Sequence, residues 1–256
     1  MKLQNKNVLI TGASAGIGKS CAEAFAEQGA NIILFARREE KLKELQSELS
    51  EKYNAKVYIA QCDVRNYSEV KSAIDAIPAE FRTIDILVNN AGLARGLGKI
   101  YDAELNDWEE MIDTNVKGLL YVTRIITPDM VARKSGHIIN IGSIAGWENY
   151  LGGVVYCGSK HAVRAISKGM AIDLNGTGVR VTEIDPGMVE TEFSEVRFHG
   201  DTERAKTVYN GVEPLFGEDI ADIAVFAATR KSHVMIQTIV VTPTAQANAT
   251  TLHRTA

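Results

Sequence analysis

The fold of this chain depends on one stretch, Val8-Leu9-Ile10-Thr11-Gly12-Ala13-Ser14-Ala15-Gly16-Ile17-Gly18. It reads as a short apolar strand that runs into a glycine turn and then into a helix with an apolar face. Glycines in such a turn bring backbone N–H groups close to a phosphate, and the helix N-terminus adds a positive dipole. Gly29 ends the helix before a second apolar run at residues 31–36, which completes a β-turn-α-β unit. The phosphates of a dinucleotide are therefore expected to bind at Gly12, Ser14, Gly16, Ile17 and Gly18.

A second set of glycines repeats this spacing at Gly92, Gly96 and Gly98, after the apolar run 84–88. The residues that follow it, 99–104, lack an apolar helical face. We interpret this copy as a loop and not as a second phosphate site.

Seven apolar, strand-like runs alternate with helical patterns along the chain. The strands are expected at residues 7–11, 31–36, 56–61, 84–88, 137–142, 178–184 and 237–242, and helices at 38–51, 68–77, 106–133, 155–174 and 218–230. This alternation predicts the α/β class: a Rossmann-type, doubly wound parallel β-sheet flanked by helices, with residues 1–256 as a single domain.

Two segments do not fit the repeating unit. Residues 187–217 follow the sixth strand as an insertion, with a helical piece near 201–210, and we predict that they cover the substrate. The C-terminal tail, residues 243–256, is poor in large apolar residues and is expected either to fray or to cross a neighbouring subunit.

Charge, apolar runs and cysteine and histidine spacing argue against several classes of partner for this chain. The formal net charge is −4, and no basic stripe indicates a nucleic-acid partner. No apolar run reaches 18 residues and the start leaves no room for a signal peptide, so we expect no membrane association and a cytoplasmic location. Three cysteines and five scattered histidines lack metal-site spacing, so no metal is expected.

A tyrosine and a lysine four residues apart are the first candidates for chemistry. Tyr156 and Lys160 share one helix face, but Tyr67 and Lys71 have the same spacing, so the pattern alone is weak. Context separates them, because Ser143 ends a strand thirteen residues before Tyr156 and is expected to reach the same sheet edge. We interpret Tyr67 and Lys71 as part of a solvated face.

Taken together, these motifs resemble the short-chain dehydrogenase/reductase family over nearly the full chain. The matches are T-G-x-x-x-G-x-G at residues 11–18, N-N-A-G at 89–92, Asn115, Ser143, Y-x-x-x-K at 156–160, and P-G-x-x-x-T with Pro186, Gly187 and Thr191. The resemblance implies that Tyr156 is the catalytic base and that Ser143 positions the substrate oxygen. It also implies that Lys160 lowers the pKa of Tyr156 and binds the ribose, and that Asn115 holds a water for proton relay.

Physical estimates fit this mechanism. The pKa of a tyrosine, near 10, must fall to about 7 or 8 for base catalysis near neutrality. An ammonium at ~4 Å supplies about 4 kcal/mol at an effective dielectric constant near 20.

The end of the second strand indicates the cofactor. An acidic residue there would bind a ribose 2′-hydroxyl, but the chain has Arg37 and Arg38, which suit a 2′-phosphate, so NADP is expected. The alternative for these arginines is a solvated charge cluster with the neighbouring glutamates. The family resemblance adds a set of expected cofactor contacts: Asp63, Val64, Asn90, Tyr156, Lys160, Pro186, Gly187, Val189 and Thr191.

The insertion after the sixth strand is similar to that of the NADP-dependent 3-hydroxy acid dehydrogenases, a group that includes serine and allo-threonine dehydrogenases. A small-molecule 3-hydroxy acid carries a carboxylate that needs a cation at a fixed distance. Arg197 and Arg95 are the candidates, beside Ser143 and Tyr156 as further substrate contacts. The alternatives are a general NADPH-dependent carbonyl or 3-oxoacyl reductase and, less favoured, a non-catalytic NADP-binding regulator. From the resemblance we also expect a homotetramer, with residues 106–133 and 155–174 at the interface.

Overall fold

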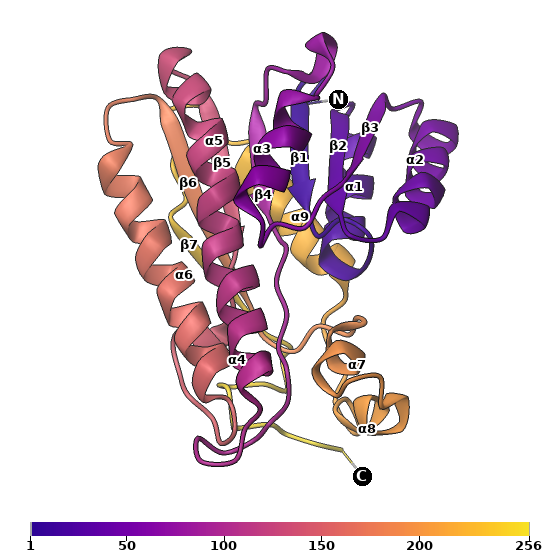
Figure 1. The fold of residues 1–256 in the computed structure, drawn as a ribbon, viewed down its shortest axis with the longest axis vertical. Coiled ribbons are helices and arrows are strands. Elements are labelled where there is room, and N and C mark those ends of the chain that lie inside the picture. The colour runs from indigo at the N-terminus through magenta and orange to yellow at the C-terminus, as the bar shows by residue number, and fades with distance from the viewer. Residues whose placement is uncertain (1, 256) are drawn as a thin grey trace.

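Seven parallel strands form one sheet in the order β3-β2-β1-β4-β5-β6-β7 in the computed structural model, which describes residues 2–255 (Figure 1). The strands are β1 Asn7–Thr11, β2 Asn31–Ala36, β3 Val57–Gln61, β4 Ile86–Asn89, β5 Gly136–Ile141, β6 Val179–Pro186 and β7 Thr238–Val241. The predicted doubly wound, Rossmann-type sheet is confirmed, and each predicted strand is found within two residues of its expected ends.

Helices connect these strands. The α-helices are α1 Gly16–Glu27, α2 Glu39–Tyr53, α3 Tyr67–Asp75, α4 Leu105–Ile112, α5 Leu119–Ala132, α6 Val154–Asp173, α7 Phe193–Arg197, α8 Thr202–Thr207 and α9 Gly217–Ala228. Two short 3-10 turns, η1 Ala79–Phe81 and η3 Ile144–Gly146, and one π-helical turn, η2 Asp113–Gly118, complete the set.

Burial follows the alternation of strand residues. On β1, Val8 and Ile10 face a core that contains residues of α1, α2 and α9, whereas Leu9 faces a second core that contains residues of α3 and α5. Parallel sheets need this cover on both faces, because both sides of each strand are apolar. The seven-stranded sheet is thereby a rigid platform for the loops at its carboxyl edge.

The strand order reverses between β1 and β4, and ligands of open α/β sheets bind at such a point. Here the loops after the two strands are tied together. Thr11 Oγ1 accepts the backbone N–H of Asn90 at 3.1 Å, and Asn90 Nδ2 donates to the carbonyl of Gly12 at 3.1 Å. The glycine turn and the N-N-A-G loop therefore form one wall.

The helix predicted at 106–133 is found over residues 105–132, but one of its turns is π-helical. The π-helical turn η2 separates α4 from α5. It contains Asn115, whose amide bonds both backbone groups of Leu93, with Oδ1 accepting its N–H and Nδ2 donating to its carbonyl at 2.8 Å each. The extra residue of the π-helical turn rotates this side chain toward the loop after β4. A side chain on a regular α-helix would not point at that loop.

A buried polar network joins two strands to two helices. Asn89 Nδ2 donates to Thr123 Oγ1 and to Asn140 Oδ1, and Asn140 Nδ2 donates to Ser167 Oγ, all at 2.9 Å. Asn140 is fully buried. Its loss would leave several buried polar atoms without partners.

We therefore predict that Asn140→Ala lowers the free energy of unfolding by about 3 kcal/mol. Urea denaturation measures the change. The matched control, Asn106→Ala on the exposed surface of α4, is expected to stay within about 0.5 kcal/mol of the parent. Equal losses for the two variants would contradict the prediction.

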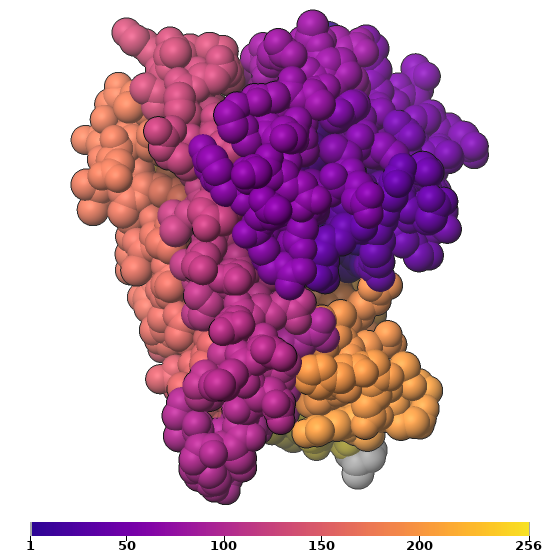
Figure 2. Space-filling view, viewed as in Figure 1, coloured from indigo at the N-terminus to yellow at the C-terminus, as the bar shows by residue number. Residues whose placement is uncertain are grey.

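Residues 187–217, called the lid below, contain α7 and α8 and form a lobe beside the carboxyl edge (Figure 2). The predicted helix near 201–210 is found as α8, and α7 was not predicted. The expectation of a frayed tail is wrong: Gln246 Oε1 accepts the N–H of Met188, and Arg254 donates to the carbonyl of Val208. The tail thus lies on the lid of its own chain.

In residues 2–255 no helix has the length and apolar character needed to cross a bilayer. The same residues contain no cluster of three metal-binding side chains. Cys21, Cys62 and Cys157 are buried free thiols. Tyr67 is exposed and Lys71 bonds Asp75, as expected for a solvated face.

Candidate active site

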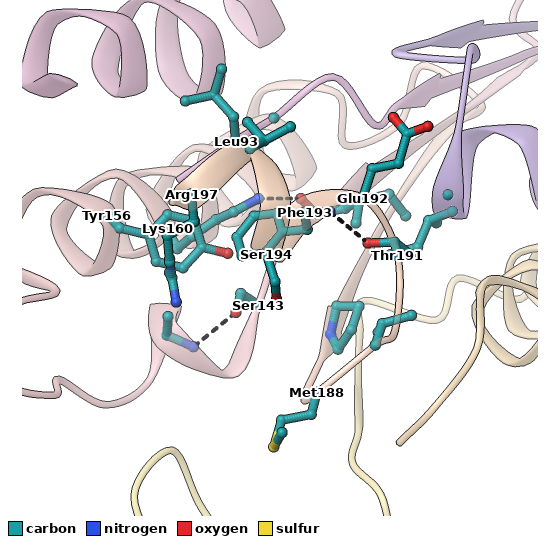
Figure 3. A pocket seen from close by; sticks show the side chains of 18 of the residues that line it. Leu93, Ser143, Tyr156, Lys160, Met188, Thr191, Glu192, Phe193, Ser194 and Arg197 are labelled. Carbon is teal, nitrogen blue, oxygen red and sulfur yellow. Dashed lines mark hydrogen bonds between the residues drawn. The ribbon is translucent and has the colours of Figure 1, made fainter. Parts of the chain in front are cut away.

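One cavity of about 500 Å³ lies at the carboxyl edge of the sheet, between the strand ends and the lid (Figure 3). Its lining includes residues predicted for the cofactor and for catalysis: Gly12, Ser14, Gly16, Ile17, Arg38, Asn90, Ser143, Tyr156, Lys160, Pro186, Gly187, Val189, Thr191 and Arg197. Segments far apart in the sequence therefore meet in a single site.

The glycine turn has a backbone that favours glycine and packs closely against the N-N-A-G loop. Gly12 and Gly16 have φ of +64° and +52°, a region that favours glycine. A Cβ on Gly12 would lie 2.8 Å from Ala91 Cα. The first turn of α1 has neither a side-chain cap nor an acidic residue, so its N–H groups point to an anion site. These features fit the diphosphate of a dinucleotide.

The two arginines after β2 differ in position. Arg38 lines the cavity, donates to Ser14 Oγ from Nε and Nη2 at 3.2 and 3.1 Å, and pairs with Glu192 at 2.8 Å. Arg37 lies outside the cavity lining and is 3.5 Å from Glu110. The structure therefore favours Arg38 as the phosphate ligand.

The predicted adenine contacts, Asp63 and Val64, also lie outside this cavity lining. Asp63 forms an ion pair with Arg65, whose guanidinium lowers the carboxyl pKa against the effect of burial. Val64 is buried and packs against Gly118. Their contact with a cofactor remains a prediction from the family resemblance.

Ser143, Tyr156 and Lys160 are brought together as expected. Ser143 follows β5 and caps η3, where its Oγ accepts the N–H of Ala145 at 3.1 Å. Tyr156 and Lys160 are one turn apart on α6 and both are buried. Lys160 Nζ donates to the carbonyl of Ile141 at 2.9 Å. The loop after β5 and helix α6 thus place these three side chains in one wall of the cavity.

Asn115 is close to this group but does not line the cavity. Beyond its bonds to Leu93, its Nδ2 donates to Ser159 Oγ at 3.0 Å. The side chain therefore anchors the loop after β4 to α6. Its expected role in holding a water remains a prediction.

The electrostatics of Tyr156 differ from expectation. Burial raises its pKa, and the charge of Arg197 opposes this more than any other group, followed by a hydrogen bond from Ser143. Lys160 Nζ is 6.0 Å from the centre of the tyrosine ring, because it is held by Ile141. Burial also lowers the pKa of Lys160 to about 8, although the carboxylates of Asp185 and Glu183 raise it.

Arg197 comes from α7 and reaches the wall that contains Tyr156 and Lys160 (Figure 3). Its Cζ is 5.1 Å from the ring centres of both Tyr156 and Phe193, and Nη2 donates to the Tyr150 hydroxyl at 2.6 Å. Its Nε is buried without a hydrogen-bond partner among residues 2–255. A donor of this kind is available to an anionic substrate.

Arg95, the other candidate for a substrate carboxylate, is placed elsewhere. Its Nε donates to Glu110 at 2.7 Å and its Nη1 to the carbonyl of Val196 at 2.6 Å. It lines a smaller cavity behind Tyr150 and not the one that contains Ser143. Its guanidinium therefore holds the end of α7 in place.

Sequence reasoning missed Tyr150, which orients Arg197. Tyr150 belongs to an irregular segment between η3 and α6, where no periodic pattern indicates which way a side chain points. Burial raises its pKa, so the hydroxyl stays neutral. Only the folded loop reveals this contact.

Comparison with known proteins agrees with this arrangement. Residues 6–201 match the short chain dehydrogenase family. The chain is 47% identical over 243 residues to an NADP-dependent 3-hydroxy acid dehydrogenase YdfG of Escherichia coli, covering 94% of this chain and 96% of that one. It is 45% identical over 241 residues to sulfoacetaldehyde reductase 2 of Chromohalobacter salexigens, covering 94% and 95%.

Among solved structures, the closed form of a serine dehydrogenase complexed with NADP⁺ superposes with a TM-score of 0.92 at 47% identity. The match covers 97% of this chain and 99% of that one. The family match, the identity to these relatives and the shared fold lead to one conclusion: the chain belongs to the short-chain dehydrogenase family.

Proposed function

We propose that this protein is an NADP-dependent oxidoreductase that oxidises the 3-hydroxyl of small 3-hydroxy acids or reduces the matching 3-oxo acid or semialdehyde. Serine, allo-threonine, 3-hydroxypropionate and 3-hydroxyisobutyrate are the substrates to consider. The position of Arg197 supports this proposal most strongly, because a cation with a buried, unused N–H stands beside Tyr156. Guanidinium groups bind carboxylates with a defined geometry.

Each residue has a separate task in this proposal. Arg197 binds the substrate carboxylate, and Ser143 holds the hydroxyl oxygen that reacts. Tyr156 takes the hydroxyl proton as general base, and Lys160 supports it with positive charge. Gly12, Gly16 and Arg38 would hold NADP⁺, which when bound would supply the hydride acceptor and a further positive charge. Because burial raises the pKa of Tyr156 in the structure, the nearby cations are needed for it to act near neutrality.

The test is NADPH formation with L-serine, D-serine, L-allo-threonine, 3-hydroxypropionate, 3-hydroxyisobutyrate and a plain secondary alcohol, each with NADP and with NAD. Turnover of hydroxy acids with NADP, with only slow turnover of the plain alcohol, is expected. Reaction with the alcohol alone would instead support a general carbonyl reductase. No activity with any of these substrates, and none in the reverse direction with 3-oxo substrates, would contradict both the 3-hydroxy acid dehydrogenase and the carbonyl reductase.

Arg38 is expected to select the cofactor. We predict that Arg38→Ala raises the KM for NADP about tenfold and leaves the KM for NAD unchanged, because a charge-assisted contact to the 2′-phosphate is lost. Steady-state kinetics with both cofactors measure this. Arg37→Ala is the matched control and is expected to change either KM less than threefold. Equal losses for NADP and NAD would contradict the assignment.

The protein is also proposed to form a homotetramer. Several apolar side chains on the helices expected at the interface are exposed, among them Leu120, Val131, Val154 and Ile172. Exposed apolar residues that gather on one face mark association surfaces. Light scattering at micromolar concentration is expected to give four times the chain mass, and a monomeric mass would contradict the proposal.

We also propose a cytoplasmic location. The three cysteines are free and buried, which fits a reducing compartment. Fractionation of cells that produce the protein would test it.

A further inference from the structure

Two carboxylates lie beneath the loop that carries Ser143. Glu183 and Asp185 alternate along β6 and share one face of the sheet, and both are buried, with 0% and 1% exposure. Neither has a task in the chemistry proposed above. Burying two carboxyl groups side by side costs free energy unless neighbouring groups stabilise the charge through ion pairs or hydrogen bonds.

Asp185 holds the catalytic loop at two points. Its Oδ1 accepts the backbone N–H of Ser143 at 3.0 Å, and its Oδ2 accepts the indole N–H of Trp147 at 2.7 Å. These two residues flank η3, so one carboxylate fixes both ends of the turn. Both carboxylate oxygens of Asp185 thus accept hydrogen bonds from this loop.

Gly142 shows how closely the acids approach the backbone there. A Cβ at this position would collide with Asp185 Oδ1 and lie 3.0 Å from Glu183 Oε1. Gly142 stands between Ser143 and Ile141, the residue whose carbonyl accepts from Lys160. Both carboxylates therefore lie against the peptide that separates Ser143 from the lysine contact.

The charged groups that face this pair come from α6. Lys160 and Arg164 favour the ionised forms of both acids, and Arg164 stacks on Trp147 with its Cζ 3.3 Å from the ring centre. Lys168 is also near this ring, at 5.9 Å. The charge of Asp185 also raises the pKa of Tyr156, so the acidic pair acts on this tyrosine as well.

The two acids divide one charge between them. Burial and the charge of Asp185 raise the pKa of Glu183 to about 8, and both of its oxygens lack a donor among residues 2–255. Burial raises the pKa of Asp185 as well, but Asp185 accepts two N–H bonds that favour its ionised form, whereas Glu183 accepts none. Glu183 therefore keeps the proton and Asp185 the charge.

We propose that Asp185, backed by Glu183, is a positioning residue: its carboxylate fixes the turn that carries Ser143 and places a negative charge behind Lys160. This inference rests on the roles proposed for Ser143, Tyr156 and Lys160. It adds a pair of residues that control the reactive groups without touching the substrate.

The first test is a pH profile of Asp185→Asn. An amide at this position offers a donor to a site that already has two N–H donors, so kcat is expected to fall about tenfold, within the roughly 10²-fold cost of a 1 Å displacement. Loss of the charge also removes a group that raises the pKa of Lys160. The alkaline limb of kcat/KM is therefore expected to move to lower pH, while the KM for NADP stays constant.

Asp173→Asn, which removes an exposed carboxylate at the end of α6, is the matched control and is expected to change neither quantity. A fall in kcat with an unmoved alkaline limb would show a structural role only and would overturn the inference. An unchanged kcat would overturn it as well.

A second measurement needs no substrate. In a Trp108→Phe background Trp147 is the remaining tryptophan, and its emission is expected to titrate with the acid that accepts its N–H. Glu183→Gln is expected to remove the part of this titration near pH 8, because Glu183 is the member of the pair that ionises there. An emission that ignores both pH and Glu183→Gln would contradict the inference even in an active enzyme. An emission that responds in this way would support it even if none of the proposed substrates reacted.

Discussion

Replacing Tyr156 by phenylalanine is expected to lower kcat for hydroxy acid oxidation by about 10³-fold, within the range typical of a lost general base. The ring of Tyr156 packs edge-on against Phe193 at 5.6 Å between centres, and phenylalanine keeps this contact. The variant should therefore fold and bind NADP as the parent does. Stopped-flow or steady-state NADPH formation measures kcat, and titration of NADPH fluorescence measures cofactor binding.

The chain supplies its own control for this variant. Tyr67 also has a lysine four residues later, but it lies exposed on α3, and its hydroxyl has no role in the proposed site. Tyr67→Phe is expected to leave kcat unchanged. If Tyr156→Phe retained more than a tenth of the parent rate, Tyr156 would not be the base.

Arg197→Met is expected to reduce kcat/KM for hydroxy acids by between about 10² and 10³, because truncating one partner of a desolvated charge pair costs several kcal/mol. The methionine keeps an apolar stem between Tyr156 and Phe193 but cannot bind a carboxylate. A plain secondary alcohol has no carboxylate to lose. Whatever rate the parent shows with it should stay within about threefold in the variant.

The comparison between the two substrates separates binding from folding. Arg204→Met, on α8 of the same lid, is the matched control and should affect neither substrate, because Arg204 stacks on Phe198 but does not itself line the cavity. A parallel loss with acid and alcohol would mean that Arg197 supports the lid and not the substrate. A loss below threefold with the acids would favour the general carbonyl reductase.

The prediction and the structure differ most in which groups set the pKa of Tyr156. The Y-x-x-x-K spacing correctly placed Tyr156 and Lys160 on one face of α6. It did not reveal that Lys160 donates to Ile141 or that Arg197 has the larger influence on the pKa of Tyr156. Spacing along a helix defines neighbours on that helix only, whereas the charge at a side chain includes groups from every segment that folds around it.

The lid also combines features that the sequence predicted with features that only the structure shows. Its position after the sixth strand and the helix α8 followed from the sequence. The choice between Arg95 and Arg197 did not, because surface arginine is the default for both. Folding decided it, since Glu110 and the carbonyl of Val196 bind Arg95, whereas Arg197 is left with an unused donor beside Tyr156.

The sequence by itself determined the sheet, the glycine turn and the segments that carry Ser143, Tyr156 and Lys160. Those features depend on local periodicity and on the short-range geometry of glycine, which residues a few positions apart define. Only the tertiary structure decided which arginine stands beside Tyr156 and which carboxylates stand behind the loop that carries Ser143. Such contacts join residues more than forty positions apart, such as Ser143 with Asp185 and Tyr150 with Arg197, and no local pattern encodes them.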